Sequence, residues 1–157
     1  MDLRKILAAG AAILALALAA PAHAEGDGMI TMKSEHGVAA TLDRLAEVLK
    51  ANGLTVFARV DHRANAKGAD LDLPPTQVLI FGNPKLGTPL MQAGRSVAID
   101  LPQKALAYED GDGRVWLAYN DPAYLAQRHG ITGRTKVRGK IAGALETMMT
   151  KAAQGEM

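Results

Sequence analysis

The sequence of 157 residues contains no cysteine. This absence excludes disulfide bonds, thiolate metal sites, cysteine nucleophiles and a cysteine-linked lipid anchor. Aromatic residues make up only 4% of the chain, so we expect a core of aliphatic side chains and methionine. The 18 basic and 16 acidic residues give a net charge of +2. Without a concentrated basic face, the sequence argues against a nucleic-acid partner.

The N-terminus has the layout of a secretory signal peptide. Arg4 and Lys5 form a basic start, residues 6–20 are apolar and uncharged, and residues 22–24 are an Ala-x-Ala cleavage site. The apolar run of about 15 residues is shorter than the roughly 20 that span a membrane. We therefore predict that residues 1–24 are a signal cleaved after Ala24, and that the mature protein is periplasmic or secreted, with no membrane attachment.

Hydrophobic periodicity in the mature chain predicts the order strand, helix, four strands, helix. Apolar residues at spacings of three and four indicate an amphipathic helix from about Val38 to Leu49, and a second helix is predicted at 135–153. A short helix within 88–100 and a helical turn that begins at Pro122 are also expected. The strands are predicted at 29–33, 54–62, 76–81, 104–109 and 115–119.

This order predicts an α+β fold, with an antiparallel sheet and its helices on one face. Residues 25–33 form a lead-in with the first strand, 34–131 the core of the domain, and 132–157 a C-terminal helix that packs on the same domain. The opposite face of the sheet then needs a polar surface or a partner, so a homodimer across that face is expected. Gly139 and Gly143, four residues apart, suggest a close backbone approach in the last helix.

Alternation in the strand at 54–62 gives each residue a face. Leu54, Val56, Ala58 and Val60 share one face, and Phe57 and Arg59 belong to the other. By the same alternation His62 shares a face with Val60. We expect this face of the strand to lie toward the helices. A polar loop is expected from 63 to 73.

Six short motifs follow one another between residues 34 and 131. They are Asp61-His62, the Phe-Gly-Asn-Pro of 81–84, Gly87 with Leu90-Met91, Leu101-Pro102, Tyr108-Glu109 and the Tyr-Asn-Asp-Pro of 119–122. Together they resemble the signature of the domain of unknown function family 302. The resemblance implies a TATA-binding-protein-like fold, with the same order of elements, and a small homodimer. It implies no activity, and fold likeness to a DNA-binding protein is analogy alone.

Four residues of these motifs are candidates for a ligand-binding site: His62, Asn83, Tyr108 and Glu109. His62 titrates near neutrality and would suit a general acid or base, although a structural histidine bonded to the backbone is the alternative. Asn83 would bind a ligand through its amide or organise its own turn. Glu109 would pair with His62 or remain a solvated charge at the hairpin edge.

Other site chemistries fit the sequence less well. Gly82 and Gly87 have the spacing of a phosphate loop, but Thr88-Pro89 stands where Lys-Ser/Thr is required. A Ser-His-Asp triad would need Ser34 or Ser96, and neither lies in a nucleophile elbow. Copper would need Met29, Met32 and His36 (one cluster in sequence), but the two methionines fall on opposite faces of a strand. No metal or cofactor is predicted.

The sequence thus predicts an exported domain that binds a small ligand in a pocket between sheet and helices, near His62 and Asn83. One alternative is a structural or partner-binding homodimer. A second alternative is an enzyme that uses His62 as general acid or base.

Overall fold

Five antiparallel strands form one sheet in the order β1-β5-β4-β3-β2. The structure is a computed structural model that describes residues 28–155, so the predicted signal peptide lies outside the described residues. The predicted order of strand, helix, four strands and helix is confirmed, with shorter helices between them. The elements are β1 (Met29–Lys33), α1 (Val38–Ala51), β2 (Thr55–Asp61), α2 (His62–Gly68), β3 (Thr76–Gly82), α3 (Pro84–Ala93), η1 (Arg95–Ile99), β4 (Gln103–Glu109), β5 (Val115–Asn120), α4 (Pro122–Arg128) and α5 (Thr135–Gln154).

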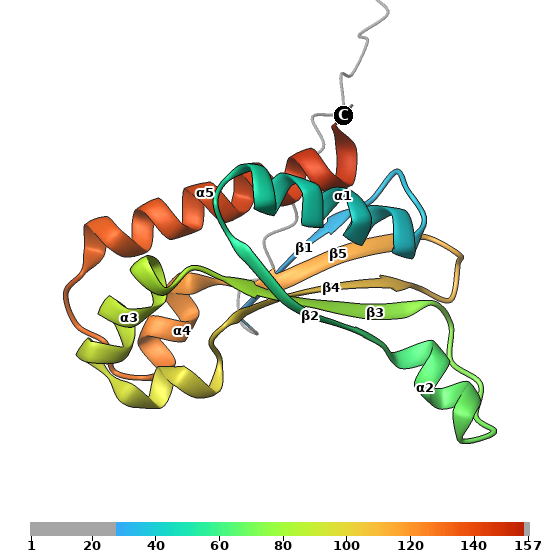
Figure 1. Cartoon of the computed structure of the whole chain (residues 1–157), viewed down its shortest axis with the longest axis horizontal. Coiled ribbons are helices and arrows are strands. Elements are labelled where there is room, and N and C mark those ends of the chain that lie inside the picture. The colour runs from blue at the N-terminus through green and yellow to red at the C-terminus, as the bar shows by residue number, and fades with distance from the viewer. Residues whose placement is uncertain (1–27, 156–157) are drawn as a thin grey trace, which may run out of the picture.

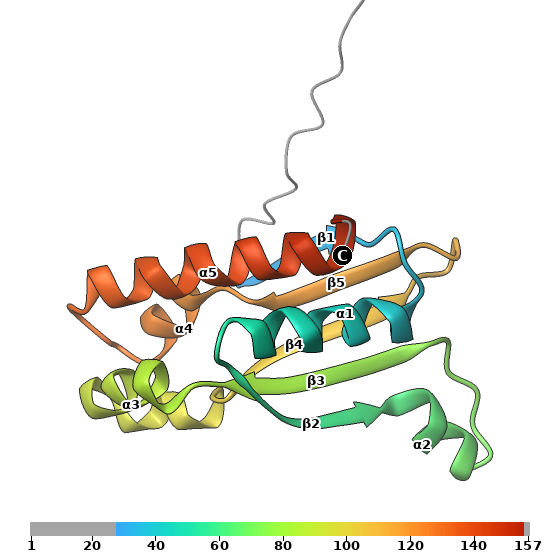
Figure 2. The same cartoon turned by 45° about the horizontal axis from the view of Figure 1, so that its top comes forward.

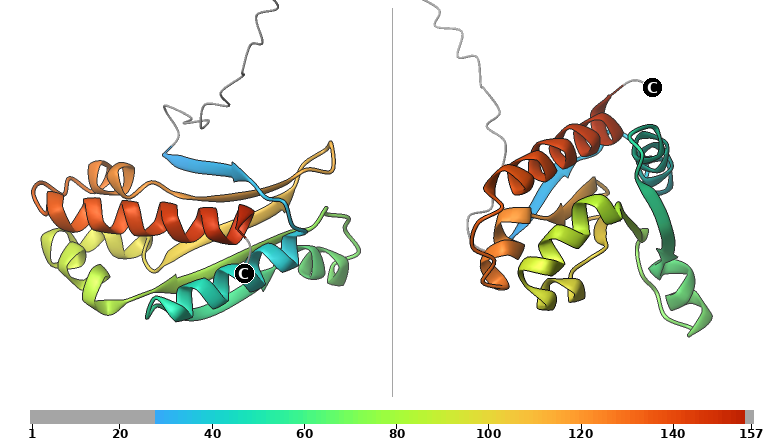
Figure 3. Two further views of the ribbon diagram at one scale, coloured as in Figure 1. Left: turned by 90° about the horizontal axis from the view of Figure 1, so that it is seen from above. Right: turned by 60° about the vertical axis from the view of Figure 1, so that its left-hand side comes forward.

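The two long helices α1 and α5 lie side by side on one face of the sheet (Figures 1 and 2). The α3, η1 and α4 segments gather beyond one end of the sheet, and α2 lies beyond the other end (Figures 1 and 2). Figure 3 shows the sheet beneath α1 and α5 from two further directions. The fold is therefore α+β with its long helices on one face, as the sequence predicts.

The core lies between these two helices and the sheet. Leu42, Leu45 and Leu49 recur on one side of α1 and are fully buried, and burial of each such side chain stabilises the fold by about 1.5–3 kcal/mol. The sheet contributes Leu79 and Phe81 of β3 to the same cluster. Aliphatic residues and methionine fill most of this core, in agreement with the low aromatic content.

The predicted close approach at the two glycines of α5 is wrong. Among the residues that the structure describes, a Cβ atom added at Gly139 or Gly143 would meet nothing within 4 Å. Both glycines are exposed, so neither is needed to bring another backbone near α5.

A β-bulge at Phe57 changes the faces that simple alternation predicts for β2. Val56 pairs with Phe81, but the register shifts before Ala58, so Phe57 has no partner of its own in the ladder. Such an extra residue exchanges the two faces for all residues that follow. Val56 keeps the helix side, as predicted, whereas Val60 moves to the open face.

The same shift brings Arg59 to the helix side. Its guanidinium donates to the Asp43 carboxylate at 2.5 Å and to the Ala39 carbonyl at 3.0 Å, both on α1, and its Nε donates to Gln77 Oε1 at 2.8 Å. The bulge therefore converts an apparently solvated arginine into a tie between β2, β3 and α1.

His62 does not face the helices, contrary to the parity argument. The strand ends at Asp61, whose carboxylate accepts a hydrogen bond from the backbone N–H of Ala64 at 2.9 Å and so caps α2. His62 is the first residue of that helix and is exposed. The loop predicted at 63–73 thus begins as a helix, because Asp61 supplies the N-terminal cap.

The open face of the sheet is apolar along its middle. Cross-strand pairing aligns Val60 of β2, Val78 of β3, Leu106 of β4 and Ala118 of β5 in one row. Near the start of β2, Phe57 is 54% exposed. This row faces away from α1 and α5, which pack on the other face.

Candidate functional site

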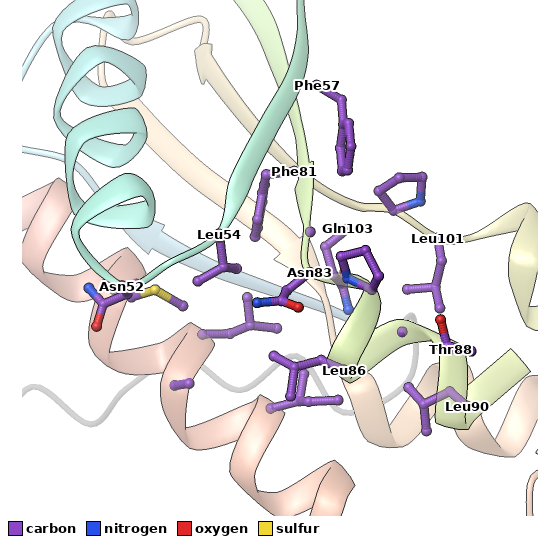
Figure 4. Close-up of a pocket in the computed structure, with 18 of the residues that line it drawn as sticks. Asn52, Leu54, Phe57, Phe81, Asn83, Leu86, Thr88, Leu90, Leu101 and Gln103 are labelled. Carbon is purple, nitrogen blue, oxygen red and sulfur yellow. The ribbon is translucent and has the colours of Figure 1, made fainter.

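A cavity of about 670 Å³ lies at the end of the sheet where α3 begins. Its size falls within the roughly 300–1,000 Å³ of small-molecule sites. The walls come from the C-terminal end of α1, the first residues of β2, the end of β3, α3, the segment between η1 and β4, and the middle of α5. Most of the lining side chains are apolar, and they include Met91 and Met148. Figure 4 labels four others: Leu54, Phe81, Leu90 and Leu101.

The cavity exists because β3 does not continue beyond Gly82. Asn83 caps α3 by accepting a hydrogen bond from the Lys85 N–H at 2.9 Å, and Pro84 occupies the first helical position. The Nδ2 atom of Asn83 also donates to the Gly53 carbonyl at 3.0 Å. These bonds turn the chain out of the sheet and hold it against the end of α1, which leaves space beneath α5.

Gln103 is a buried polar residue in this wall. It is the first residue of β4 and pairs with Phe81, so its side chain lies on the helix side of the sheet. The residue is 8% exposed, and its Oε1 is buried with no hydrogen-bond partner in residues 28–155. Figure 4 shows Gln103 among the side chains that line the cavity. Such an unpaired buried acceptor costs about 1–3 kcal/mol, so it needs an explanation.

Other polar residues lie at the edge of the cavity. Asn52 Nδ2 donates to the Val48 carbonyl at 2.8 Å and so completes the end of α1. Lys151 of α5 is the charged residue among those that line the cavity. The cavity therefore offers an apolar body, one buried acceptor and one cation at its exposed side.

The four residues predicted as a binding site do not come together. Asn83 lines the cavity, but both ends of its amide already bond to the backbone, as the turn interpretation predicts. His62, Tyr108 and Glu109 lie toward the opposite end of the sheet, since His62 follows the end of β2 and Tyr108 pairs with Thr76 at the start of β3. The length of β3, about 20 Å, separates them from Asn83.

Sequence reasoning missed Gln103, although one signal for it was present. Gln103 shares its face of β4 with Ala105 and Ala107, both fully buried. A polar residue at a buried position of an alternating strand is unusual unless a partner satisfies it. The alternation of β4 alone therefore marked Gln103 as a residue to explain.

The sequence matches the family model described as domain of unknown function DUF302 over residues 30–148. The chain belongs to the DUF302 family. A solved structure from this family, titled as that of an uncharacterized conserved protein DUF302 from Bacillus stearothermophilus, superposes with a TM-score of 0.73 at 20% sequence identity, over 82% of this chain and all of that one. The likeness confirms the fold.

Curated relatives at higher identity carry a different name. Proteins named fluoride-specific ion channel FluC 1, from Brucella suis biovar 1 and Brucella abortus biovar 1, are each 50% identical to this DUF302 chain over 131 residues. That alignment covers 82% of the chain but 51% and 48% of those proteins, so the chain spans about half of their length. Within residues 28–155 no helix is both long and apolar enough to cross a membrane.

Proposed function

We propose that this protein is an exported DUF302 domain that binds a small apolar molecule in the cavity between α3 and α5. The observation that carries the proposal is the unpaired Gln103 Oε1 in a mostly apolar wall. A ligand with an apolar body would displace water from the lining, and one N–H or O–H donor on it would satisfy that oxygen once the Gln103 amide turns toward the cavity. Lys151 would tolerate or attract an anionic group at the outer end of such a ligand.

The curated relatives that match half of their length to this chain are named as fluoride-specific ion channels. A channel must cross the membrane with its backbone polar groups satisfied, and the described part of this chain has no helix that would do so. We therefore assign the channel of those relatives to the half that this chain does not match. The DUF302 half would serve there as an accessory ligand-binding domain. A bare fluoride ion would not suit the cavity, because an anion in an apolar site needs several donors or cations.

The proposal is tested with N-phenyl-1-naphthylamine, an apolar fluorophore that carries one N–H donor. The probe should bind the mature protein with enhanced fluorescence. Gly143→Leu places a side chain on the cavity wall, where a Cβ meets nothing within 4 Å, and should weaken binding at least about tenfold. Gly139→Leu is the matched control, because Gly139 is also an exposed glycine of α5 with open space but does not line the cavity.

Native mass spectrometry of protein purified from the periplasm complements the probe. A retained mass that disappears in the Gly143→Leu variant and persists in the Gly139→Leu variant would identify the natural ligand. Equal probe binding by both variants would contradict the assignment to this cavity.

A second candidate function is that of a homodimer, favoured by the apolar row on the open face of the sheet. Two such sheets would pack face to face about 10 Å apart, with Leu106 and Val78 at the centre of the contact. Leu106→Lys should convert a dimer into a monomer in light scattering coupled to size exclusion. Ala123→Lys, on the exposed side of α4, should leave the dimer intact, and a monomeric unmodified protein would exclude this candidate.

A further inference from the structure

A serine and an aspartate that lie close together in sequence meet a distant histidine where η1 and the end of α4 approach each other. The Nε2 atom of His129 lies 2.6 Å from Asp100 Oδ2, and its Nδ1 atom lies 3.0 Å from Ser96 Oγ. The side chains of His129 and Asp100 are 7% and 13% exposed, whereas Ser96 is exposed. From this geometry we infer that Ser96 is a nucleophile, with His129 as its general base.

The contacts of Asp100 determine the tautomer of the histidine. The carboxylate can only accept, so the 2.6 Å contact requires a proton on Nε2 of His129. In the neutral ring Nδ1 then keeps its lone pair and accepts a hydrogen bond from the Ser96 hydroxyl. The two nitrogens exchange the roles they have in the usual serine triad. A general base needs one ring nitrogen that keeps its proton and a second that accepts from the nucleophile. Nε2 meets the first condition through Asp100, and Nδ1 meets the second through Ser96.

The triad residues are also held in place by backbone contacts and by the side chain of Arg128. Ser96 lies within η1 and Asp100 directly follows it, where the backbone N–H of Asp100 donates to the Val97 carbonyl at 3.0 Å. The other carboxylate oxygen of Asp100 lies 3.4 Å from Arg128 Nη1. A Cβ atom at Gly94 would lie 3.1 Å from Ile131 Cγ1 and 3.4 Å from the His129 carbonyl oxygen. Glycine at this position therefore lets the serine segment approach the histidine segment closely.

The reaction that this arrangement supports is the hydrolysis of a small carboxylic ester that reaches the surface. Ser96 Oγ would attack the carbonyl carbon as its proton passes to His129 Nδ1. The bond to the alcohol oxygen then breaks, and Nδ1 returns the proton to the departing alcohol. Water attacks the resulting Ser96 ester by the same proton transfers and releases the carboxylic acid. Asp100 acts as a positioning residue, because it touches the histidine and not the ester.

The test uses diisopropyl fluorophosphate, which bonds its phosphorus to a nucleophilic serine oxygen and releases fluoride. The chain has two serines, and Ser34 is buried with its hydroxyl 2.7 Å from that of Thr41. Ser34 is therefore an internal control that should remain unlabelled. We expect one adduct, on Ser96, by intact mass and peptide mapping, and hydrolysis of p-nitrophenyl acetate that is lost in the Ser96→Ala variant.

Two further variants separate chemistry from structure. His129→Gln should slow labelling at least about 100-fold, the usual contribution of a general base. Asp100→Asn should slow it at least about tenfold, with the unfolding midpoint of each variant measured alongside. The inference is overturned if Ser96 forms no adduct, or if the folded His129→Gln protein is labelled as fast as the unmodified one. Should that variant fail to fold, an unchanged labelling rate in Asp100→Asn overturns it.

Discussion

Replacement of Gln103 by methionine should make the ligand-free protein more stable. Methionine matches glutamine in length and has no branch, so it fills the same space. The change removes a buried acceptor that has no partner within residues 28–155, and the cost of such an orphan is about 1–3 kcal/mol. A gain of about 1 kcal/mol would raise the melting temperature by roughly 3–5 °C in a domain of this size.

Gln77 provides the control on the same face of the sheet. Its Oε1 accepts from Arg59 Nε at 2.8 Å and its Nε2 donates to Asp61 Oδ2 at 2.8 Å. Gln77→Met should therefore destabilise the protein by about 1–2 kcal/mol. Urea unfolding of the two variants, each compared with the unmodified protein, measures both effects. If Gln103→Met destabilises as Gln77→Met does, the Gln103 amide is already satisfied and the reasoning fails.

The same Gln103→Met variant should bind N-phenyl-1-naphthylamine more weakly, by about 1 kcal/mol or fivefold. Higher stability together with weaker binding would show that the unpaired oxygen is kept for the ligand. Higher stability with unchanged binding would mean that the ligand does not use Gln103.

Three further predictions follow from single residues. Burial, followed by the charges of Glu146 and Asp121, raises the pKa of Tyr119 to about 12; stability should therefore fall as pH rises from about 10 through 12, with a phenolate absorbance midpoint near the upper value. The Trp116 indole N–H donates to Asp110 at 2.7 Å and lowers the pKa of that carboxyl well below 3.8. The ionised carboxylate therefore stabilises the fold above about pH 4, and this stabilisation is lost on acidification. Asp110→Asn should remove that part of the acid dependence of unfolding. Gly139→Ala should stabilise α5 by about 0.5–1 kcal/mol in urea unfolding, because the added methyl meets no atom within 4 Å.

The order of the fold was predictable because each main element has its own hydrophobic period. The spacing of Leu42, Leu45 and Leu49 predicts α1, and Pro122 after Asp121 predicts the start of α4, where the Asp121 carboxylate accepts from the Ala123 N–H at 2.8 Å. Local signals of this kind need no knowledge of the rest of the chain.

The faces of β2 and both candidate sites were not predictable in the same way. Phe57 has no partner in β3, so each later residue of β2 lies on the face opposite to the one that simple alternation predicts. The alternation of apolar and polar residues in the sequence gives no sign of this bulge. Ser96 and His129 are 33 residues apart, so their contact depends on how η1 and α4 pack. The cavity depends on segments from α1 to α5 that meet only in the folded chain. Of the four residues predicted as a binding site, Asn83 lines its walls.

The bulge in β2 also bears on how the protein avoids unwanted assembly. The strand order places β2 at one border of the sheet, where unpaired backbone groups would template the addition of a strand from another molecule. A residue out of register at Phe57 breaks the regular row of donors and acceptors along that border and increases the local twist. A neighbouring chain could match only a few residues on either side of it. We expect this irregularity to hinder aggregation through the edge of the sheet in a chain that has no disulfide.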